Sequence, residues 1–199
     1  MDWRVVMRRC PSRSMTIVGD LAQRESPAGA TSWARMLESY VPSRWTYRQL
    51  TINYRMPTEI MDVAARVLST MDPSLQPPKS VRSTGVRPWS RRCAQSDLAA
   101  AVTAAVEAES AEQGTVAVIV PEGLELPIEH PVVTPRASKG LEYDSVVIVE
   151  PARILAAEPS GPADLYVALT RATQRLGVVH TEDLPEELSG LALMTDGAG

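Results

Sequence analysis

Short apolar runs alternate along the chain with longer segments in which apolar and polar residues recur at helical spacing. The runs TVAVIV, PVVT, SVVIV and RLGVVH are rich in valine and isoleucine. Such runs are typical of parallel strands that are buried on both faces. Two further strands are predicted in SMTIVGD (residues 14–20) and WTYRQLTINYR (residues 45–55), which contain β-branched and aromatic residues.

Helices are predicted between these strands. Pro57 suits the first turn of a helix, and apolar residues follow it at the spacing of one helical face. This face consists of Ile60, Val63, Ala64, Val67, Leu68 and Met71. Further helices are predicted over residues 27–41, from a cap at Ser96 to about Gly114, and over residues 163–174. The alternation predicts an α/β fold with a mostly parallel sheet flanked by helices, and such sheets bind ligands at the carboxyl ends of their strands.

The last predicted helix carries arginines of interest. Its buried stripe would consist of Leu165, Ala168, Leu169, Ala172 and Leu176. A turn of about 100° per residue then directs Arg171 outward, and Arg175 one turn later completes a face with two arginines. The proline-rich segment 72–92 is predicted to be a loop or insertion. Its basic end is either an ordinary solvated loop or a nucleic-acid contact made by Arg82, Arg87, Trp89, Arg91 and Arg92.

Composition narrows the possible functions. A net charge of −4 argues against a free-standing nucleic-acid-binding domain, which is usually basic. Two cysteines without metal-ligand spacing and two histidines predict neither a metal site nor a disulfide framework. The chain has no signal peptide or apolar run of membrane-spanning length, so we expect a soluble cytoplasmic protein.

Three polar residues in or next to the predicted strands and helices have side chains that can bind a terminal phosphate group. Arg55 and Arg171 carry guanidinium groups, which bind phosphate bidentately and neutralise charge on a transferred phosphoryl group. The side-chain amide of Gln23 is suited to sensing the phosphate or orienting water. Each residue alone is a weak signal, and their order along the chain makes them informative.

The segments TIVGDLAQ, LTINYR, VVTPRASKGLEYDSVVIVE and YVALTRA resemble motifs III, IV, V and VI, in that order, of the UvrD/Rep-like superfamily 1 helicases. The resemblance implies a RecA-like, P-loop NTPase type fold. Residues 1–43 would be a short remnant of the first RecA-like lobe, with motif III. Residues 44–199 would form the second motor lobe, with motifs IV to VI and the insertion at about 72–92.

The resemblance also implies roles for individual residues. Gln23, Arg55 and Arg171 would contact the γ-phosphate of ATP, with Arg171 as the arginine finger. Glu142 would reach the ribose, Asp20 belongs to the same nucleotide site, and Gly140 would let the backbone approach closely. The residues implied to contact nucleic acid are Thr134, Arg136 and Lys139.

Together, GDLAQ with TSW, NYRMPTEIM, TPRASKGLEYDSV and YVALTRATQRLGVVH look most like the HelD-type branch, whose members bind RNA polymerase and release it from nucleic acid. Three departures from the usual helicase pattern imply a weak grip on a nucleic-acid strand. One is Arg136, preceded by Pro135, at a motif V position that is commonly histidine. The aromatic residue that stacks on a base after motif III in translocating helicases is absent, since Trp33 is the first aromatic after Gln23. The segment between Arg55 and Thr134 is also too short for the large accessory subdomain of UvrD-like enzymes. A conventional DNA-unwinding helicase and a non-catalytic binding module remain alternatives.

The chain contains no G-x-x-x-x-G-K-[ST] phosphate loop and no acidic pair upstream of GDLAQ. We therefore expect a C-terminal fragment that does not hydrolyse ATP alone and binds no cofactor tightly, whereas its parent uses ATP with Mg²⁺. The expected partners are the missing first lobe and, through the parent, single-stranded DNA or RNA polymerase. An unpaired strand at residues 15–18 would also favour a non-physiological dimer of the fragment.

Overall fold

The computed structural model describes residues 3–20, 22, 32–71 and 75–194. Its centre is a six-stranded sheet in the order β5-β4-β6-β7-β3-β8, in which every pair is parallel. The strands are β3 (Trp89–Arg92), β4 (Val116–Ile119), β5 (Val132–Val133), β6 (Tyr143–Val149), β7 (Ala172–His180) and β8 (Ala192–Leu193). This confirms the predicted α/β class and the strands expected in the four valine-rich runs.

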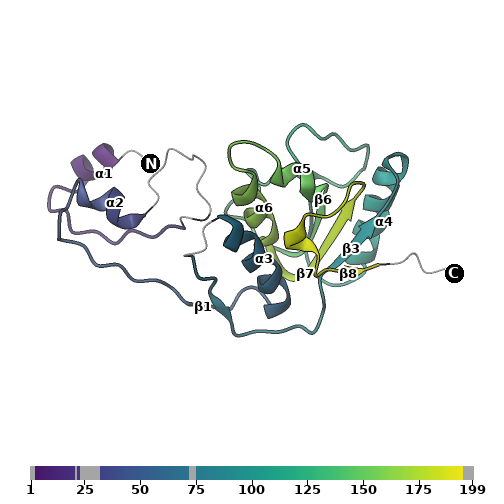
Figure 1. Ribbon diagram of the computed structural model, residues 1–199, viewed down its shortest axis with the longest axis horizontal. Helices are drawn as coiled ribbons and strands as arrows, with labels where there is room; N and C mark the ends of the chain where they lie inside the picture. Colours follow the sequence, from purple (N-terminus) through teal and green to yellow (C-terminus); the bar gives the residue numbers. More distant parts are fainter. Residues whose placement is uncertain (1–2, 21, 23–31, 72–74, 195–199) are drawn as a thin grey trace.

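Helices cover both faces of this sheet (Figure 1). One face packs against α3 (Thr58–Met71), α5 (Pro151–Leu155), α6 (Gly161–Leu169) and the 3-10 turn η3 (Glu186–Leu188). The other face packs against α4 (Leu98–Ser110). Alternate residues of β6 serve the two layers, because Ile148 lies in the first hydrophobic cluster and Val147 in the second. The continuous apolar run of β6 therefore reflects burial on both faces.

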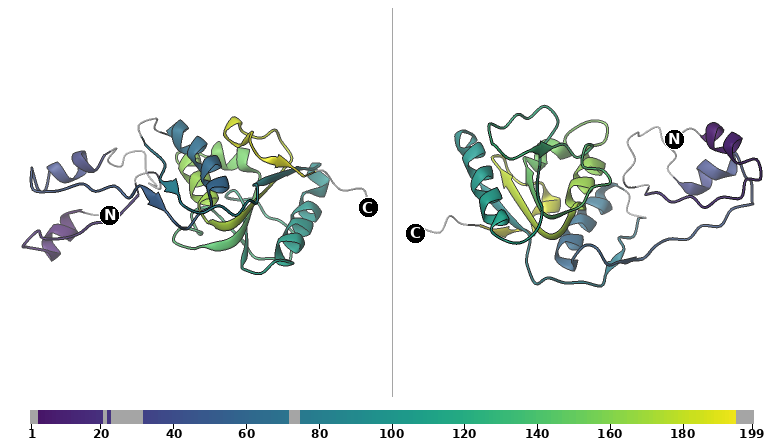
Figure 2. Two further views of the ribbon diagram at one scale, coloured as in Figure 1. Left: turned by 90° about the horizontal axis from the view of Figure 1, so that it is seen from below. Right: turned by 180° about the vertical axis from the view of Figure 1, so that it is seen from behind.

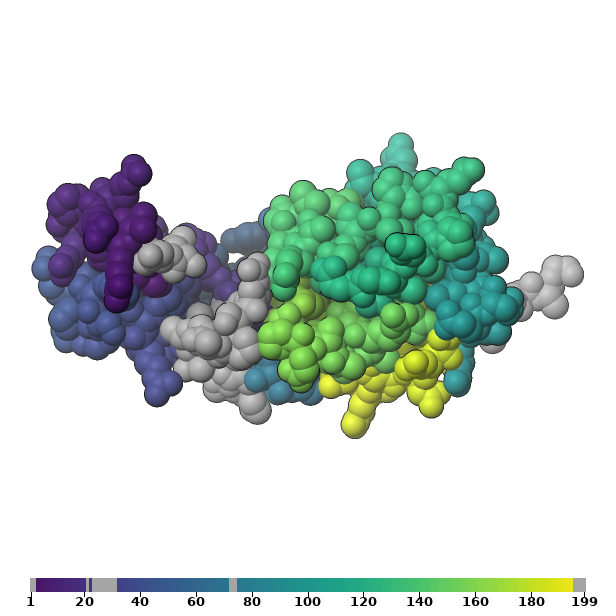
Figure 3. Space-filling model, turned by 90° about the horizontal axis from the view of Figure 1, so that it is seen from above, coloured from purple at the N-terminus to yellow at the C-terminus, as the bar shows by residue number. Residues whose placement is uncertain are grey.

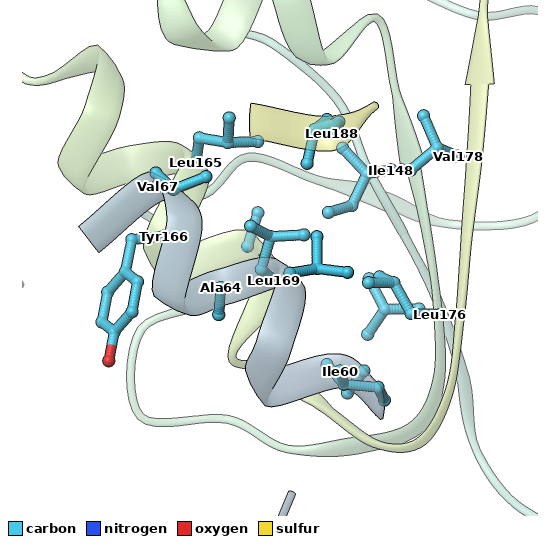
Figure 4. Packing of buried hydrophobic residues seen from close by; sticks show 14 of the residues in the cluster. Ile60, Ala64, Val67, Ile148, Leu165, Tyr166, Leu169, Leu176, Val178 and Leu188 are labelled. Atoms are coloured by element: carbon cyan, nitrogen blue, oxygen red, sulfur yellow. The ribbon is translucent and has the colours of Figure 1, made fainter. Parts of the chain in front are cut away.

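The face of α3 predicted from its spacing packs against α6. Ile60, Ala64 and Val67 are fully buried, and they lie beside Leu165 and Leu169 in the first cluster (Figure 4). The helix after Pro57 is thus confirmed. The predicted cap of α4 is wrong: the 3-10 turn η2 (Gln95–Asp97) precedes the helix, and the Ser96 hydroxyl donates to the neighbouring Asp97 carboxylate.

The proline-rich segment is not only a loop. It contains β2 (Lys79–Ser80), which pairs with β1 (Ile52–Asn53) in a small separate sheet, and β3, which lies inside the main sheet. Trp89 of β3 is opposite Gly177 of β7, and a Cβ at Gly177 would lie 2.1 Å from the Trp89 ring. The missing side chain at Gly177 therefore makes room for the indole. The packing of Trp89 against Gly177 joins distant parts of the sequence, so the proline- and arginine-rich segment did not predict β3.

The N-terminal region has few buried residues. Helices α1 (Trp3–Arg9) and α2 (Trp33–Glu38) lie at one end of the molecule, apart from the main sheet (Figures 2 and 3). Ser32 caps α2 by accepting a hydrogen bond from the Arg35 amide at 3.2 Å. Residues 15–18 form no strand, and only Ile52–Asn53 of the strand predicted at 45–55 is paired. β-Prone sequence alone does not form a strand here, because it lacks a hydrogen-bonding neighbour.

Candidate functional site

Four predicted residues converge at the amino-terminal ends of β6 and β7. Glu142 immediately precedes β6 and Arg171 immediately precedes β7, whose first residues are paired in register. The Tyr143 amide donates to the Arg171 carbonyl at 3.0 Å, which joins the two turns. Asp20 and Arg55 lie close enough for their charges to act on Arg171. The expected location at the carboxyl ends of the strands is therefore wrong for this cluster, because its residues lie in the turns that lead into the strands.

Arg171 is buried, contrary to the prediction that it points outward. Only 5% of the residue is exposed. Its Nε donates to the Val167 carbonyl, Nη1 to the Leu141 carbonyl and Nη2 to the Thr170 hydroxyl, each at 3.1 Å. The prediction failed because α6 ends at Leu169, so the helical rotation of about 100° per residue does not extend to Arg171.

The electrostatic surroundings of Arg171 are mixed. Burial lowers the pKa of its guanidinium, and the positive charge of Arg55 lowers it further, while Glu142 and Asp20 act in the opposite direction. A guanidinium nevertheless stays protonated in proteins. The two arginines thus lie beside two carboxylates, with which an arriving anionic group would have to compete.

Arg55 reaches this cluster from a different element. The Asn53 side-chain oxygen accepts hydrogen bonds from the Arg55 amide at 2.9 Å and the Met56 amide at 3.2 Å, which fixes the turn after β1. The Arg55 guanidinium then forms an ion pair with Glu142 at 2.6 Å. About half of each side chain is exposed, so both groups are accessible to a ligand from solvent.

Sequence reasoning missed Tyr166. Burial raises the pKa of its hydroxyl to about 12, with a further contribution from the Asp20 carboxylate, so the phenol stays protonated and neutral. Its hydroxyl points away from the aliphatic side chains of the first cluster (Figure 4). Tyr166 lies on α6, five residues before Arg171, and it is not a member of the buried stripe predicted for this helix.

The loop between β5 and β6 carries the residues expected to contact nucleic acid. Thr134 begins this loop, and its hydroxyl and carbonyl accept hydrogen bonds from the Ala137 and Ser138 amides, respectively. Arg136 is exposed and Lys139 half-buried within it. Gly140 has a positive φ of 81°, and a Cβ added there would meet no atom within 4 Å, so glycine relieves the backbone rather than making room for a neighbour. Gln23 lies outside the described residues.

Arg175 does not form an arginine face with Arg171. It belongs to β7, and its Nε forms a 2.6 Å ion pair with Glu109 of α4. Glu109 also accepts hydrogen bonds from Ser145 at 2.7 Å and Trp89 at 3.0 Å. Although burial raises the pKa of Glu109, the hydrogen bonds from Ser145, Arg175 and Trp89 outweigh it and lower the pKa overall. This buried network therefore joins α4 to three strands.

Within the part of the chain that the structure describes, no group of three or more His, Cys, Asp or Glu side chains is arranged to hold a metal ion. In that same part, every helix is too short or too polar to cross a membrane.

The parallel sheet and its covering helices define an α/β domain. A family model for the viral superfamily 1 RNA helicase core domain matches residues 4–180, and the chain therefore belongs to this family. No curated protein matches the chain by sequence.

A solved structure shares the fold. The C-terminal domain of a possible DNA helicase from Lactobacillus plantarum WCFS1 aligns with a TM-score of 0.52 and 17% identity, covering 71% of this chain and 98% of that one. The PRRSV helicase aligns with a TM-score of 0.43 and 19% identity, over 73% of this chain and 28% of that one. The chain therefore spans about a quarter of the viral enzyme's length and nearly all of the bacterial domain.

Proposed function

We propose that this chain supplies the second motor lobe of an ATP-dependent superfamily 1 helicase, with Arg55 and Arg171 contacting the γ-phosphate. The observation that carries the proposal is the convergence of Arg55, Glu142 and Asp20 around Arg171. These residues come from four separate segments, each of which resembles a different helicase motif. The four residues are far apart in the sequence, and they lie together beside the amino-terminal ends of the central strands β6 and β7.

The geometry of Arg171 suits an arginine finger. Three of its five N–H donors are held by Val167, Leu141 and Thr170, so the guanidinium is oriented before any nucleotide arrives. A preorganised cation stabilises charge that develops on a transferred phosphoryl group without a reorganisation cost. Arg55 is more exposed, and an arriving phosphate would compete with Glu142 for its guanidinium. Glu142 would then be released toward the ribose.

ATP would bring its Mg²⁺, and the lobe that carries the phosphate loop would hold both from the opposite side. Bound ATP supplies the phosphoryl group and the leaving nucleoside diphosphate. The residues of this chain would bind the terminal phosphate, orient it and neutralise its charge. We expect this chain alone to show no turnover, because it contains no phosphate-loop motif.

The finer part of the proposal is that the parent belongs to the HelD-type, RNA-polymerase-recycling branch and acts in the cytoplasm. It is supported by the absence of an aromatic residue directly after GDLAQ and by the short segment between Arg55 and Thr134. A conventional DNA-unwinding enzyme is the competing function, because Thr134, Arg136 and Lys139 occupy the loop in which motif V would contact a strand.

The first test is ATP turnover by a polypeptide that joins this chain to the first motor lobe with its phosphate loop. We expect Arg171→Ala to lower kcat by about 10³ or more, as for other arginine fingers, with a smaller effect on nucleotide binding. Arg153→Ala on α5 is the matched control, because Arg153 is an exposed arginine outside the cluster. A variant without Arg171 that keeps most of its turnover would contradict the assignment.

Because Arg171 is buried, its loss could also disturb folding. Arg55→Ala removes the other proposed contact to the γ-phosphate, at an exposed position, and should also lower kcat strongly. Assays with single-stranded DNA and with RNA polymerase then separate the two functions. Strong stimulation by DNA alone would indicate a translocating helicase, whereas DNA-insensitive turnover with tight polymerase binding would support the recycling factor.

A further inference from the structure

Strand β7 contains a one-residue bulge that begins two residues after Arg171, beyond the paired residue Ala172. Tyr143 of β6 pairs with Ala172, but Ser145 pairs with Arg175, so two residues of β7 stand opposite one residue of β6. The extra residue lies at Thr173–Gln174. A bulge bends its strand and re-aims the side chains beside it. Arg171 enters β7 through the pairing of Ala172 with Tyr143, and the bulge adjoins this pairing on its other side.

The side chain of Arg82 holds the bulge from outside the strand. Its Nη2 donates to the Thr173 carbonyl and to the Gln174 side-chain oxygen, the latter at 2.9 Å. Arg82 is half-buried, and both acceptors are part of the bulge itself. From the other side, the Thr173 hydroxyl donates to the Tyr143 carbonyl at 3.1 Å. The bulge is thus fixed between Arg82 and β6.

The main chain around Arg82 is hydrogen-bonded to residues on both sides of the turn that carries Arg55. Its carbonyl accepts hydrogen bonds from the Thr58 amide at 2.8 Å and the Thr58 hydroxyl at 3.1 Å, at the start of α3. The preceding amide, of Val81, donates to the Asn53 carbonyl at 3.0 Å. Asn53 is also the residue whose side chain fixes the turn at Arg55.

The residues after Arg82 are anchored to the same helix end. Glu59, in the first turn of α3, accepts hydrogen bonds from the Ser83 hydroxyl and from the Gly85 amide, the latter at 2.8 Å. These bonds lower the pKa of Glu59, with the Ser83 hydroxyl making the largest contribution. In Figure 1 the chain accordingly runs from β2 beneath α3 toward β3. Arg82 is therefore part of a fixed turn.

We propose that Arg82 is a positioning residue that sets the distance between the two phosphate-binding arginines, Arg55 and Arg171. This inference rests on the proposed function of those two residues. Arg82 belongs to the turn that stabilises the Arg55 loop, and its guanidinium binds the bulge that follows Arg171. Its planar fork serves two acceptors at once, which a lysine ammonium on a flexible stem does not reproduce. The hypothesis that Arg82 contacts nucleic acid is replaced by this internal role.

The first experiment compares Arg82→Met and Arg82→Lys in the two-lobed polypeptide. We expect Arg82→Met to lower kcat for ATP by about tenfold to a hundredfold, because small misplacements remote from the chemistry have effects of this size. KM should change much less, and Arg82→Lys should recover part of the loss. Arg153→Met is the matched control for removing a guanidinium elsewhere. Unchanged kcat in Arg82→Met would overturn the proposal.

A double-mutant cycle separates positioning from general damage. If Arg82 acts through Arg171, Arg82→Met should have little further effect on turnover in the Arg171→Ala background. A merely structural role would instead lower turnover by the same factor in both backgrounds, and this additivity would contradict the inference.

Hydrogen exchange on the 199-residue chain tests the contact without ATP. Arg82→Met should accelerate exchange at the Thr58, Val81 and Tyr143 amides, while the central amides of β6 stay protected. Uniform protection in the variant would overturn the proposal. Faster exchange combined with full turnover in Arg171→Ala would refute the proposed function and leave the Arg82 contact standing. If Arg171→Ala is inactive while Arg82→Met matches the wild type in exchange and turnover, the proposed function stands and the role of Arg82 is refuted.

Discussion

Residues 52–194 and residues 3–50 differ in how their apolar side chains are used. In the first region, two hydrophobic clusters fill both faces of one sheet, and residues such as Ile148 and Leu165 are fully buried. Among the described residues of the second region, the buried hydrophobic residues are Ala22, Leu37 and Val41, and α1 has none. The shared core thus lies almost entirely in residues 52–194, and residues 3–50 contribute Ala22 to its first cluster.

The difference shows that strand formation depends on neighbours. Val18 and Leu50 lie in segments with high β-propensity, yet they are 85% and 82% exposed and lie outside any strand. The SVVIV segment is also rich in β-branched residues, but it lies between β4 and β7, which satisfy its backbone on both sides. β-Propensity measures how well a residue fits a sheet that already exists.

The largest effect on the free energy of unfolding is expected from a substitution in the core of residues 52–194. Leu165→Ala should lower the free energy of unfolding by about 4 kcal/mol, since Leu165 is fully buried in the first cluster and its loss leaves a cavity. The matched change Leu37→Ala should cost less than about 1 kcal/mol in the same unfolding transition, because Leu37 lies outside both clusters and its region opens locally. Urea unfolding followed by circular dichroism measures both values. Equal effects would mean that the two regions unfold as one unit.

A smaller loss of stability is expected when the buried carboxylate of Glu109 is replaced. Glu109→Gln should lower the free energy of unfolding by about 2 kcal/mol at neutral pH, because Arg175 loses its buried anionic partner. The folded pKa of Glu109 lies below its ordinary value of 4.5, so its stabilisation is complete above that pH and is lost as the pH falls through the folded pKa. The difference between wild type and variant should therefore shrink below about pH 4. A difference that is independent of pH would exclude an ionised Glu109.

The smallest effect on stability is expected at the Arg55–Glu142 ion pair. Glu142→Gln removes this pair, whose two side chains are about half exposed. Exposed ion pairs contribute at most about 1 kcal/mol and are screened by salt. Thermal unfolding should therefore hardly change, whereas turnover in the two-lobed polypeptide should fall. A large loss of stability at high ionic strength would assign Glu142 a structural role.

Much of the site was predictable because its residues occupy short ordered motifs. Arg55, Glu142, Asp20 and Arg171 were all identified along the chain, and the structure brings them together. The orientation of Arg171 was not predictable, because it depends on α6 ending at Leu169 and on the distant Leu141 carbonyl. The contacts of Arg82 and the burial of Tyr166 depend on segments that are distant in the sequence, so no local pattern predicts them.

The sequence by itself determined the α/β class, the strands in the valine-rich runs and the buried face of α3, because burial on one or both faces imposes a local periodicity. Only the tertiary structure decided that β3 enters the main sheet, that the site lies at the amino ends of β6 and β7, and that Arg175 binds Glu109. These features depend on which segments meet in space. Such pairings follow from the packing of the whole domain, which no local window of residues contains.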